Sequence, residues 1–294
     1  MRREGLLRVN RPTGEENISM SKKVLLTGAS GALGRVLTTG LAEKGHAMIL
    51  SDIADFPDAL PQGSEFRKQD LSDKAAFDAM ANEVSAIVHF GAVSIDRPFD
   101  EVLGPNFVGT YNIFELARAA KARVIFASSV HSIGFHERTT KLDENCDHRP
   151  DGYYGISKVY GEMFGRLYWD KHAVESLSIR IGSCVPKPTE RRHLASWLSY
   201  PDLVGLVAAG LTAPDLGCRV VWGASNNKRR WWNSTRDAEL GYQVKDNAED
   251  YAAEVNNDSI GELAERYQGG IYTSNFGYSC ETPSPADIFY WMKR

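Results

Sequence analysis

Two adjacent tyrosines, Tyr153 and Tyr154, stand shortly before a lysine in the segment YYGISKVYGE, residues 153–162, and the spacing decides which of the two could act chemically. If the segment is helical, Tyr154 and Lys158 point about 40° apart around the axis, whereas Tyr153 and Lys158 point about 140° apart. A tyrosine has an unperturbed pKa of about 10, which a nearby ammonium group lowers. The spacing therefore predicts Tyr154 as a general base assisted by Lys158, with Tyr153 as a packing residue. A solvated helix pair is the competing interpretation.

A second group of residues that could bind a ligand is the segment TGASGALG, with glycines at 28, 31 and 34. It follows an apolar run and opens a helical pattern. In that position Gly28 permits a tight turn, Gly31 lets the backbone approach a pyrophosphate, and Gly34 allows close packing of helix on strand. The helix N-terminus then faces the phosphates. The segment predicts a dinucleotide-binding loop, and a tight turn without a ligand is the alternative.

Acidic residues at the ends of the next two strands indicate which dinucleotide is bound. Asp52 lies about 20 residues beyond the glycines, where a carboxylate accepts hydrogen bonds from the adenosine ribose and repels a 2′-phosphate. Asp52 therefore favours NAD, with a surface turn as the alternative, and Asp70 is expected near the adenine. The residues expected to bind NAD are Gly28, Ser30, Gly31, Ala32, Leu33, Gly34, Asp52, Ile53, Asp70, Leu71, Gly91 and Ala92, with Tyr154 and Lys158.

Short apolar runs alternate with helical patterns through the first half of the chain. Expected strands at 23–28, 47–52, 85–92, 122–129 and 175–182 are separated by helical patterns at 32–45, 76–84 and 106–121 and by the helix that begins near Tyr154. Such alternation predicts an α/β fold of the Rossmann type, a doubly wound parallel sheet with helices on both faces.

This rhythm breaks after Gly182, where two prolines and a basic cluster precede a further helical pattern at 202–213 and a strand at 219–225. We expect residues 21–182 to form the NAD-binding domain. Residues 183–294 are expected to form a small substrate-binding lobe and tail, interleaved with that domain. The first 20 residues read as a disordered extension.

Composition limits the choice of partner and compartment. The 294 residues carry a formal charge of −4, which argues against a nucleic-acid partner, and no apolar run approaches the roughly 20 residues of a membrane span. The four cysteines are far apart without a C-x-x-C pair, as in reduced cytoplasmic proteins. We expect a cytoplasmic protein with no metal site.

Several motifs together resemble a known family. The segments TGASGALG, HFGAVS, NFVGTYNIFE, FASS and YGISK resemble the extended short-chain dehydrogenase/reductase superfamily. More narrowly, SIDRPFDEVLGPNFVGTYN, RPDGYYGISKVYGE, RIGSCVPKPTERRHLASWLS, CRVVWGAS and WWN resemble uronate dehydrogenases. The resemblance implies oxidation of a sugar acid at its anomeric carbon to an aldarolactone, with NAD taking the hydride. It also suggests a homo-oligomer.

The resemblance also implies roles for particular residues. Ser129 would hydrogen-bond the reacting oxygen, Lys158 would hold the nicotinamide ribose, and Arg192 would clamp the sugar carboxylate, with Arg191 as its rival. Asn106 matches a family position whose role is either functional or structural. The residues expected to contact substrate are Ser94, Ser129, His131, Tyr154, Ser183 and Arg192.

One position departs from the family pattern. Val130 stands where the family usually has an asparagine, so one sugar hydroxyl is expected to lose its partner there or to be absent from the substrate. Three other functions therefore stay open. They are an aldose or sugar-phosphate dehydrogenase, a nucleotide-sugar epimerase that keeps NAD bound, and an NAD-sensing binding protein on the same fold.

Overall fold

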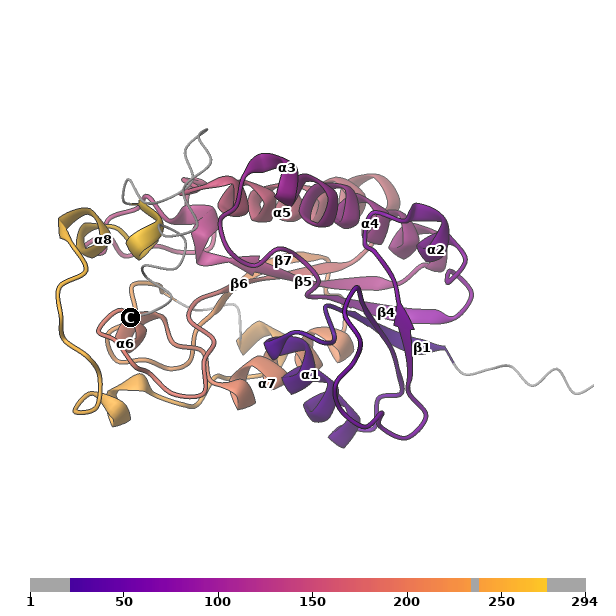
Figure 1. Ribbon diagram of the computed structural model, residues 1–294, viewed down its shortest axis with the longest axis horizontal. Helices are drawn as coiled ribbons and strands as arrows, with labels where there is room; N and C mark the ends of the chain where they lie inside the picture. The colour runs from indigo at the N-terminus through magenta and orange to yellow at the C-terminus, as the bar shows by residue number, and fades with distance from the viewer. Residues whose placement is uncertain (1–21, 234–237, 274–294) are drawn as a thin grey trace, which may run out of the picture.

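Seven parallel strands form one sheet through the middle of the molecule, in the order β3-β2-β1-β4-β5-β6-β7. The computed structural model describes residues 22–233 and 238–273 (Figure 1). The expected N-terminal extension and the end of the tail lie outside these residues. The strands are β1 (Lys23–Thr27), β2 (Met48–Asp52), β3 (Glu65–Lys68), β4 (Val84–His89), β5 (Arg123–Ser129), β6 (Ser176–Ile181) and β7 (Cys218–Gly223).

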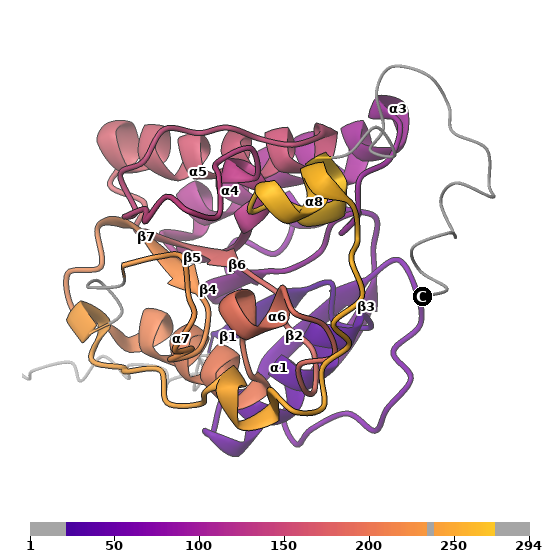
Figure 2. The ribbon, with the colours of Figure 1, turned by 90° about the vertical axis from the view of Figure 1, so that its left-hand side faces the viewer.

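Helices cover both faces of this sheet, as the two perpendicular ribbon views show (Figures 1 and 2). One face carries α2 (Lys74–Asp78), α3 (Phe99–Val102), α4 (Gly109–Ala120) and α5 (Tyr153–His172), and the other carries α1 (Ala32–Glu43) and α7 (Tyr200–Thr212). Two short helices, α6 (His193–Ser196) and α8 (Glu262–Arg266), lie beyond the sheet at one end of the molecule.

Side-chain alternation along the strands builds two apolar cores. In β5, Val124 and Phe126 belong to the core under α4 and α5, whereas Ile125 and Ala127 belong to the core under α1 and α7. Successive side chains on a strand point to opposite faces, so a strand that is buried on both faces must be apolar throughout. This explains the continuous apolar runs in the sequence, and the expected α/β class is confirmed.

Two elements differ from the sequence pattern. The helical pattern expected at 76–84 forms only α2, which ends at Asp78. The helix expected at 106–121 begins with a π-helical turn, Leu103–Val108, and continues as α4. Pro105 lies inside that turn, and a proline has no N–H for an α-helical hydrogen bond. π-helical turns are frequent at functional sites.

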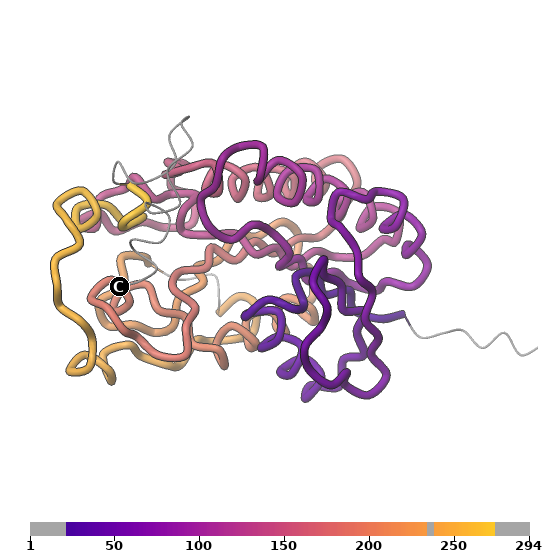
Figure 3. The backbone as a smooth tube through the Cα atoms, viewed as in Figure 1, coloured from indigo at the N-terminus to yellow at the C-terminus, as the bar shows by residue number. Residues whose placement is uncertain are grey.

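The chain after residue 182 returns to the sheet. β7 pairs with β6 along its whole length, and α7 packs beside α1. The remaining described segments include 3-10 helices at Ala238–Leu240, Ala248–Tyr251 and Gly270–Thr273, of which the first packs against α7 and the second against α6. Figure 3 shows the described C-terminal segment, in yellow, at the same end of the molecule as α6. Within the described residues, no helix is both long and apolar enough to cross a membrane.

Candidate active site

The glycine loop lies between β1 and α1, where β1 has β2 on one side and β4 on the other. Ligands of open α/β sheets bind at such a reversal of strand order. Gly28 has a φ of +72°, and a Cβ there would lie 2.6 Å from the backbone nitrogen of Gly91. A Cβ on Gly34 would lie 2.0 Å from the carbonyl oxygen of Gly28. The packing of the protein itself therefore requires both glycines.

Gly31 is different, because a Cβ there would approach no atom closer than 3.4 Å, an ordinary contact distance. It is the exposed N-cap of α1, and no side chain of the described residues caps that helix; Ala32 and Leu33 begin it. The first N–H groups of a helix have no partner within the helix and bind anions. The packing of the protein itself therefore does not require a glycine at residue 31, and the open backbone there leaves room for a phosphate.

Asp52 ends β2, and its carboxylate is joined to the glycine loop. Its Oδ2 accepts from the Ser30 N–H and its Oδ1 from the Ala54 N–H, both at 3.0 Å. Each carboxylate oxygen can accept more than one hydrogen bond, so acceptor capacity remains for ribose hydroxyls. Asp52 is half-buried and the neighbouring Ile53 is 67% exposed, so both are accessible to a ligand.

The residues that follow β3 and β4 complete this edge of the sheet. Asp70 is exposed, and hydrogen bonds from the N–H and hydroxyl of Ser72 lower its pKa. Leu71 packs against Gly91, where a Cβ would lie 2.9 Å from the leucine Cδ1. Ala92 follows, partly buried. Gly91 thus contacts both Leu71 and Gly28, and Asp70 is exposed beside them.

Tyr154, Lys158 and Ser129 lie next to one another in a buried group. Ser129 is the last residue of β5, and its hydroxyl forms a hydrogen bond with the Tyr154 side chain. The Lys158 ammonium lies 5.3 Å from the centre of the Tyr154 ring, one turn along α5. All three side chains are buried. Tyr153 instead packs edge-on against Phe99 of α3.

Burial dominates the ionisation of this group. It raises the pKa of Tyr154 to about 12, against the opposite effect of the hydrogen bond with Ser129. Burial also lowers the pKa of Lys158 to about 7. Among the described residues no carboxylate pairs with Lys158, whose ammonium also lies 5.2 Å from the centre of the Phe126 ring. Within the protein alone, desolvation therefore outweighs the expected lowering of the Tyr154 pKa by Lys158.

Two buried polar side chains hold α5 and the loop after β4 together. Asn106, in the π-helical turn, accepts from the Val93 N–H and donates to the Val93 carbonyl and to the Ser157 hydroxyl. Asp96 accepts from the Tyr154 N–H at 3.0 Å. Asn106 thus bridges two elements of the site. Ser94, in the bridged loop, is exposed.

Arg192 and Ser183 meet at the far side of the site. The guanidinium donates from Nη1 to the Ser183 hydroxyl at 3.0 Å, and from Nε and Nη2 to the carbonyl of Gln268. One hydrogen on each terminal nitrogen has no partner among residues 22–233 and 238–273. Burial lowers the pKa of Arg192, and the charges of Glu190 and Asp151 partly offset this effect. The Arg192 guanidinium thus offers a ligand two N–H donors in a partly buried position.

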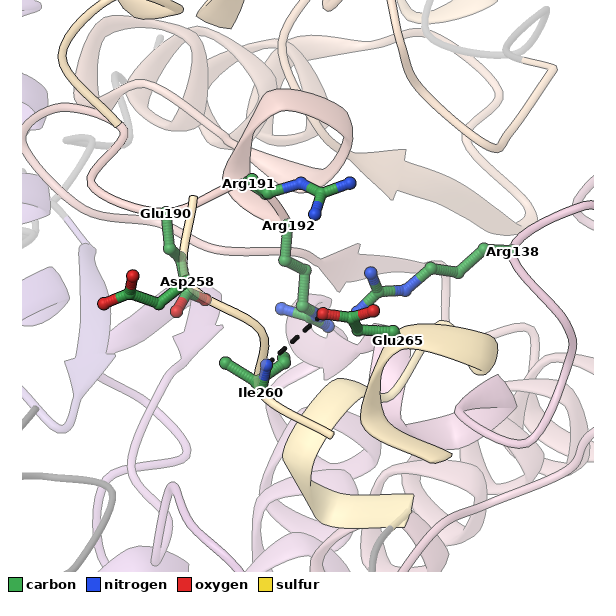
Figure 4. Close-up of a pocket in the computed structure, with 7 residues that line it drawn as sticks. All are labelled: Arg138, Glu190, Arg191, Arg192, Asp258, Ile260 and Glu265. Carbon is green, nitrogen blue, oxygen red and sulfur yellow. Dashed lines mark hydrogen bonds between the residues drawn. The ribbon is translucent and has the colours of Figure 1, made fainter. Parts of the chain in front are cut away.

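A cavity of about 250 Å³ adjoins this arginine (Figure 4). Arg191, which is exposed, lines it as well, so the two rival arginines share one space. The other lining residues are Arg138, Glu190, Asp258, Ile260 and Glu265, and the Ile260 N–H donates to Glu265. Three guanidinium and three carboxylate groups line the cavity, and the guanidinium groups suit a polar ligand with an anionic end.

His131 and Val130 follow Ser129 in a 3-10 helix, Val130–Ile133, and point into different surroundings. The His131 ring lies between Tyr154 and Tyr272, with ring centres 5.7 and 4.1 Å away. Val130 is 1% exposed and belongs to an apolar cluster with the stacked rings of Trp222 and Trp232. Its side chain therefore packs in a core, and replacing asparagine by valine here fits those apolar neighbours.

Comparison with known proteins supplies the family. Residues 24–233 match the model of the NAD dependent epimerase/dehydratase family. A uronate dehydrogenase of Pseudomonas syringae pv. tomato is 43% identical over 257 residues, which are 86% of this chain and 94% of that protein. The chain belongs to this family, among its uronate dehydrogenases. It is therefore an NAD-dependent oxidoreductase.

Solved structures of uronate dehydrogenases agree with this assignment. The crystal structure of the enzyme from Agrobacterium tumefaciens superposes with a TM-score of 0.83 at 39% identity, covering 89% of this chain and 99% of that one. A mutant of the same enzyme, complexed with NAD, superposes equally well. The glycine loop and Asp52 of this chain are the groups that fit that cofactor.

Sequence reasoning misses several residues that the fold brings to this site. Asp96, Asp151 and Tyr272 lie within electrostatic range of Tyr154 or its neighbours. Asp151 stands three residues before Tyr154, and that nearness to the motif is a signal that could have identified it. The contact of Arg192 with Gln268 is through a backbone carbonyl, so no residue type could have revealed it.

Proposed function

We propose that the chain oxidises a hexuronic acid, D-glucuronate or D-galacturonate, at C1 to the aldarolactone, with NAD as hydride acceptor. The observation that carries the proposal is that Tyr154 and Arg192 lie near the same two side chains, Asp151 and Tyr272. The charge of Asp151 acts on both Tyr154 and Arg192, and Tyr272 also lies within range of both. A proton acceptor and a carboxylate-binding group therefore lie near the same two side chains, an arrangement that oxidation of a sugar acid could use.

The catalytic roles follow from the group around Tyr154. Bound NAD would supply the hydride acceptor and the positive charge of its nicotinamide ring. Tyr154 takes the proton of the C1 hydroxyl as general base. The Lys158 ammonium stabilises the phenolate form of Tyr154, which must exist before it can take this proton, and by family resemblance Lys158 also holds a ribose of the cofactor. Ser129 donates a hydrogen bond to the reacting oxygen.

Substrate selection is assigned to the residues around Arg192, at the far side of the site from Ser129. The two N–H groups of Arg192 that remain can bind a carboxylate in bidentate fashion, which gives both affinity and orientation. Ser94, His131 and Ser183 are assigned to sugar hydroxyls. The three arginines that line the adjoining cavity also suit a phosphate, so a sugar-phosphate dehydrogenase is the second candidate.

We also infer that the protein associates with a second copy of itself. Exposed apolar side chains gather on the outer helical layer, at Leu103, Val108 and Tyr111 and, on α5, at Ile156, Met163 and Leu167. α4 and α5 pack against each other in the helical layer that covers one face of the sheet. An apolar face of this kind is complementary to itself across a twofold axis.

The proposed function is tested by NADH absorbance with purified protein, NAD and one of four sugars: glucuronate, galacturonate, glucose or glucose 6-phosphate. We expect turnover only with the two uronates. Tyr154→Phe should lower kcat at least about a hundredfold, because a general base contributes about 10²- to 10⁴-fold, while NAD binding is retained. Turnover only with glucose or glucose 6-phosphate would reject the uronate assignment, and wild-type rates in Tyr154→Phe would reject the base.

The same assay separates the two arginines. Arg192→Ala should raise the KM for uronates at least about tenfold, because it removes charge-assisted hydrogen bonds, and should leave the KM for NAD unchanged. Arg191→Ala is the matched control, since it removes the same charge from the adjacent, exposed position. Equal effects of the two substitutions would show that no specific clamp exists at Arg192.

A further inference from the structure

A buried carboxylate lies behind the histidine of the proposed substrate site. The Oδ2 of Asp151 is 2.8 Å from the Nδ1 of His131. The Asp151 side chain is 0% exposed, and that of His131 is 14% exposed. Burying a charged carboxylate is costly unless partners compensate for it. The pair is therefore a specific arrangement rather than a chance surface contact.

The surrounding backbone leaves space for this carboxylate and for little else. A Cβ on Gly134 or on Gly269 would lie 1.9 Å from the Asp151 Oδ2. Gly269 donates from its N–H to the carbonyl of Gly134 at 2.8 Å, which joins the two walls. The Asp151 N–H donates to the His131 carbonyl at 3.3 Å. Three separate segments thus fix the position of one carboxylate.

This contact decides which nitrogen of His131 carries a proton. A carboxylate only accepts hydrogen bonds, so the neutral imidazole must carry its hydrogen on Nδ1 and leave Nε2 as an acceptor. The ring is also held between Tyr154 and Tyr272, which limits its rotation. The orientation and the tautomer of His131 are both set before any substrate binds.

We propose that Asp151 is a positioning residue of this enzyme, which holds His131 as the Nδ1-protonated tautomer so that Nε2 accepts a hydrogen bond from a hydroxyl of the sugar. The part that concerns the sugar rests on the proposed function. The part that concerns the tautomer does not, because it follows from the protein's own contacts.

The tautomer is tested directly by ¹⁵N NMR of histidine-labelled protein, with the His131 signals assigned by their loss in His131→Gln. At a pH where the ring is neutral, we expect a protonated Nδ1 and an unprotonated Nε2. Asp151→Asn should abolish that preference, because an amide can donate to Nδ1 as well as accept from it. A wild-type ring that is protonated on Nε2 would overturn the proposal, whatever substrate the enzyme oxidises.

The role in substrate binding is tested with a double-mutant cycle of Asp151→Asn and His131→Ala. Asp151→Asn alone should lower kcat/KM for the uronate about tenfold to a hundredfold, the value of one hydrogen bond with charged character, without changing NAD affinity. In the His131→Ala background it should have no further effect, because Asp151 acts through that ring. Additive losses would overturn the proposed route through His131.

A matched control is Asp147→Asn, which removes the same charge from an exposed position in the same loop and should leave kcat/KM unchanged. Thermal unfolding of each variant shows whether it is folded under assay conditions. If no substrate in the panel is turned over, the proposed function fails while the NMR result for Asp151 still stands or falls on its own.

Discussion

Among single side chains, His89 shows most clearly how burial changes ordinary chemistry. It ends β4, its Nδ1 lies 2.7 Å from the Thr27 hydroxyl, and it is 2% exposed. Burial lowers its pKa to about 3, and the positive charge of Lys158 contributes in the same direction. His89 is therefore neutral in the folded protein, whereas His131 is exposed enough to meet a ligand and is oriented by a carboxylate.

The lowered pKa of His89 in the folded protein predicts that the free energy of unfolding depends on pH. Below its ordinary pKa of about 6.5, His89 binds a proton in the unfolded chain but not in the folded one until about pH 3. The free energy of unfolding should therefore fall as pH decreases through this window, by up to about 1.4 kcal/mol per pH unit from this group.

Urea unfolding of wild type and His89→Asn between pH 4 and pH 6 measures that contribution. The wild type should lose stability more steeply than the variant as pH falls, because the asparagine has no proton to bind. His172→Asn, at the exposed end of α5, controls for the loss of an imidazole. Parallel curves for wild type and His89→Asn would contradict the burial argument.

Among the elements, α5 is the one on which the site depends most. Tyr154, Lys158 and Glu162 follow one another at intervals of four residues and so share one face of the helix. Glu162 accepts from Arg180 of β6 at 3.0 and 2.8 Å and from the Ser128 hydroxyl of β5. The two charged side chains are 1% and 2% exposed. The pair joins α5 to two strands, one turn beyond Lys158.

Removing one member of this pair should be costly. Arg180→Met leaves the Glu162 carboxylate buried without its cation and should lower the free energy of unfolding by about 3–5 kcal/mol. The double replacement Arg180→Met with Glu162→Leu removes both charges and should recover more than half of that loss.

Urea unfolding of the single and double variants provides the measurement. Arg166→Met is the control, because it breaks an exposed pair with Asp170 on the same helix and should cost at most about 1 kcal/mol. A double variant as unstable as the sum of its two single variants would show that the pair is not linked in this way.

For the whole molecule, the outer layer of α4 and α5 predicts self-association. Met163 and Leu167 are 49% and 42% exposed on adjacent turns of α5. Sedimentation equilibrium at micromolar concentration should give at least a dimer for the wild type. The double substitution Met163→Lys with Leu167→Lys should give a monomer, because it places like charges in an apolar contact.

The control for this measurement is Leu60→Lys, which introduces a lysine at a similarly exposed residue outside the two helices. It should keep the mass of the wild type. A monomeric wild type, or an unchanged mass in the double variant, would locate any interface elsewhere.

The sequence by itself determined the class of fold, the glycine-rich turn after the first strand and the proximity of Tyr154 and Lys158 on one helix. These features depend on local spacing: strand and helix periods, a glycine triplet in one turn, and two side chains one helical turn apart. Only the tertiary structure decided that Asp151 orients His131, that Gln268 holds Arg192 through its carbonyl, and that Val130 packs beside Trp222 and Trp232. Such contacts join segments far apart in the chain, and packing selects them without leaving a periodic pattern in the sequence.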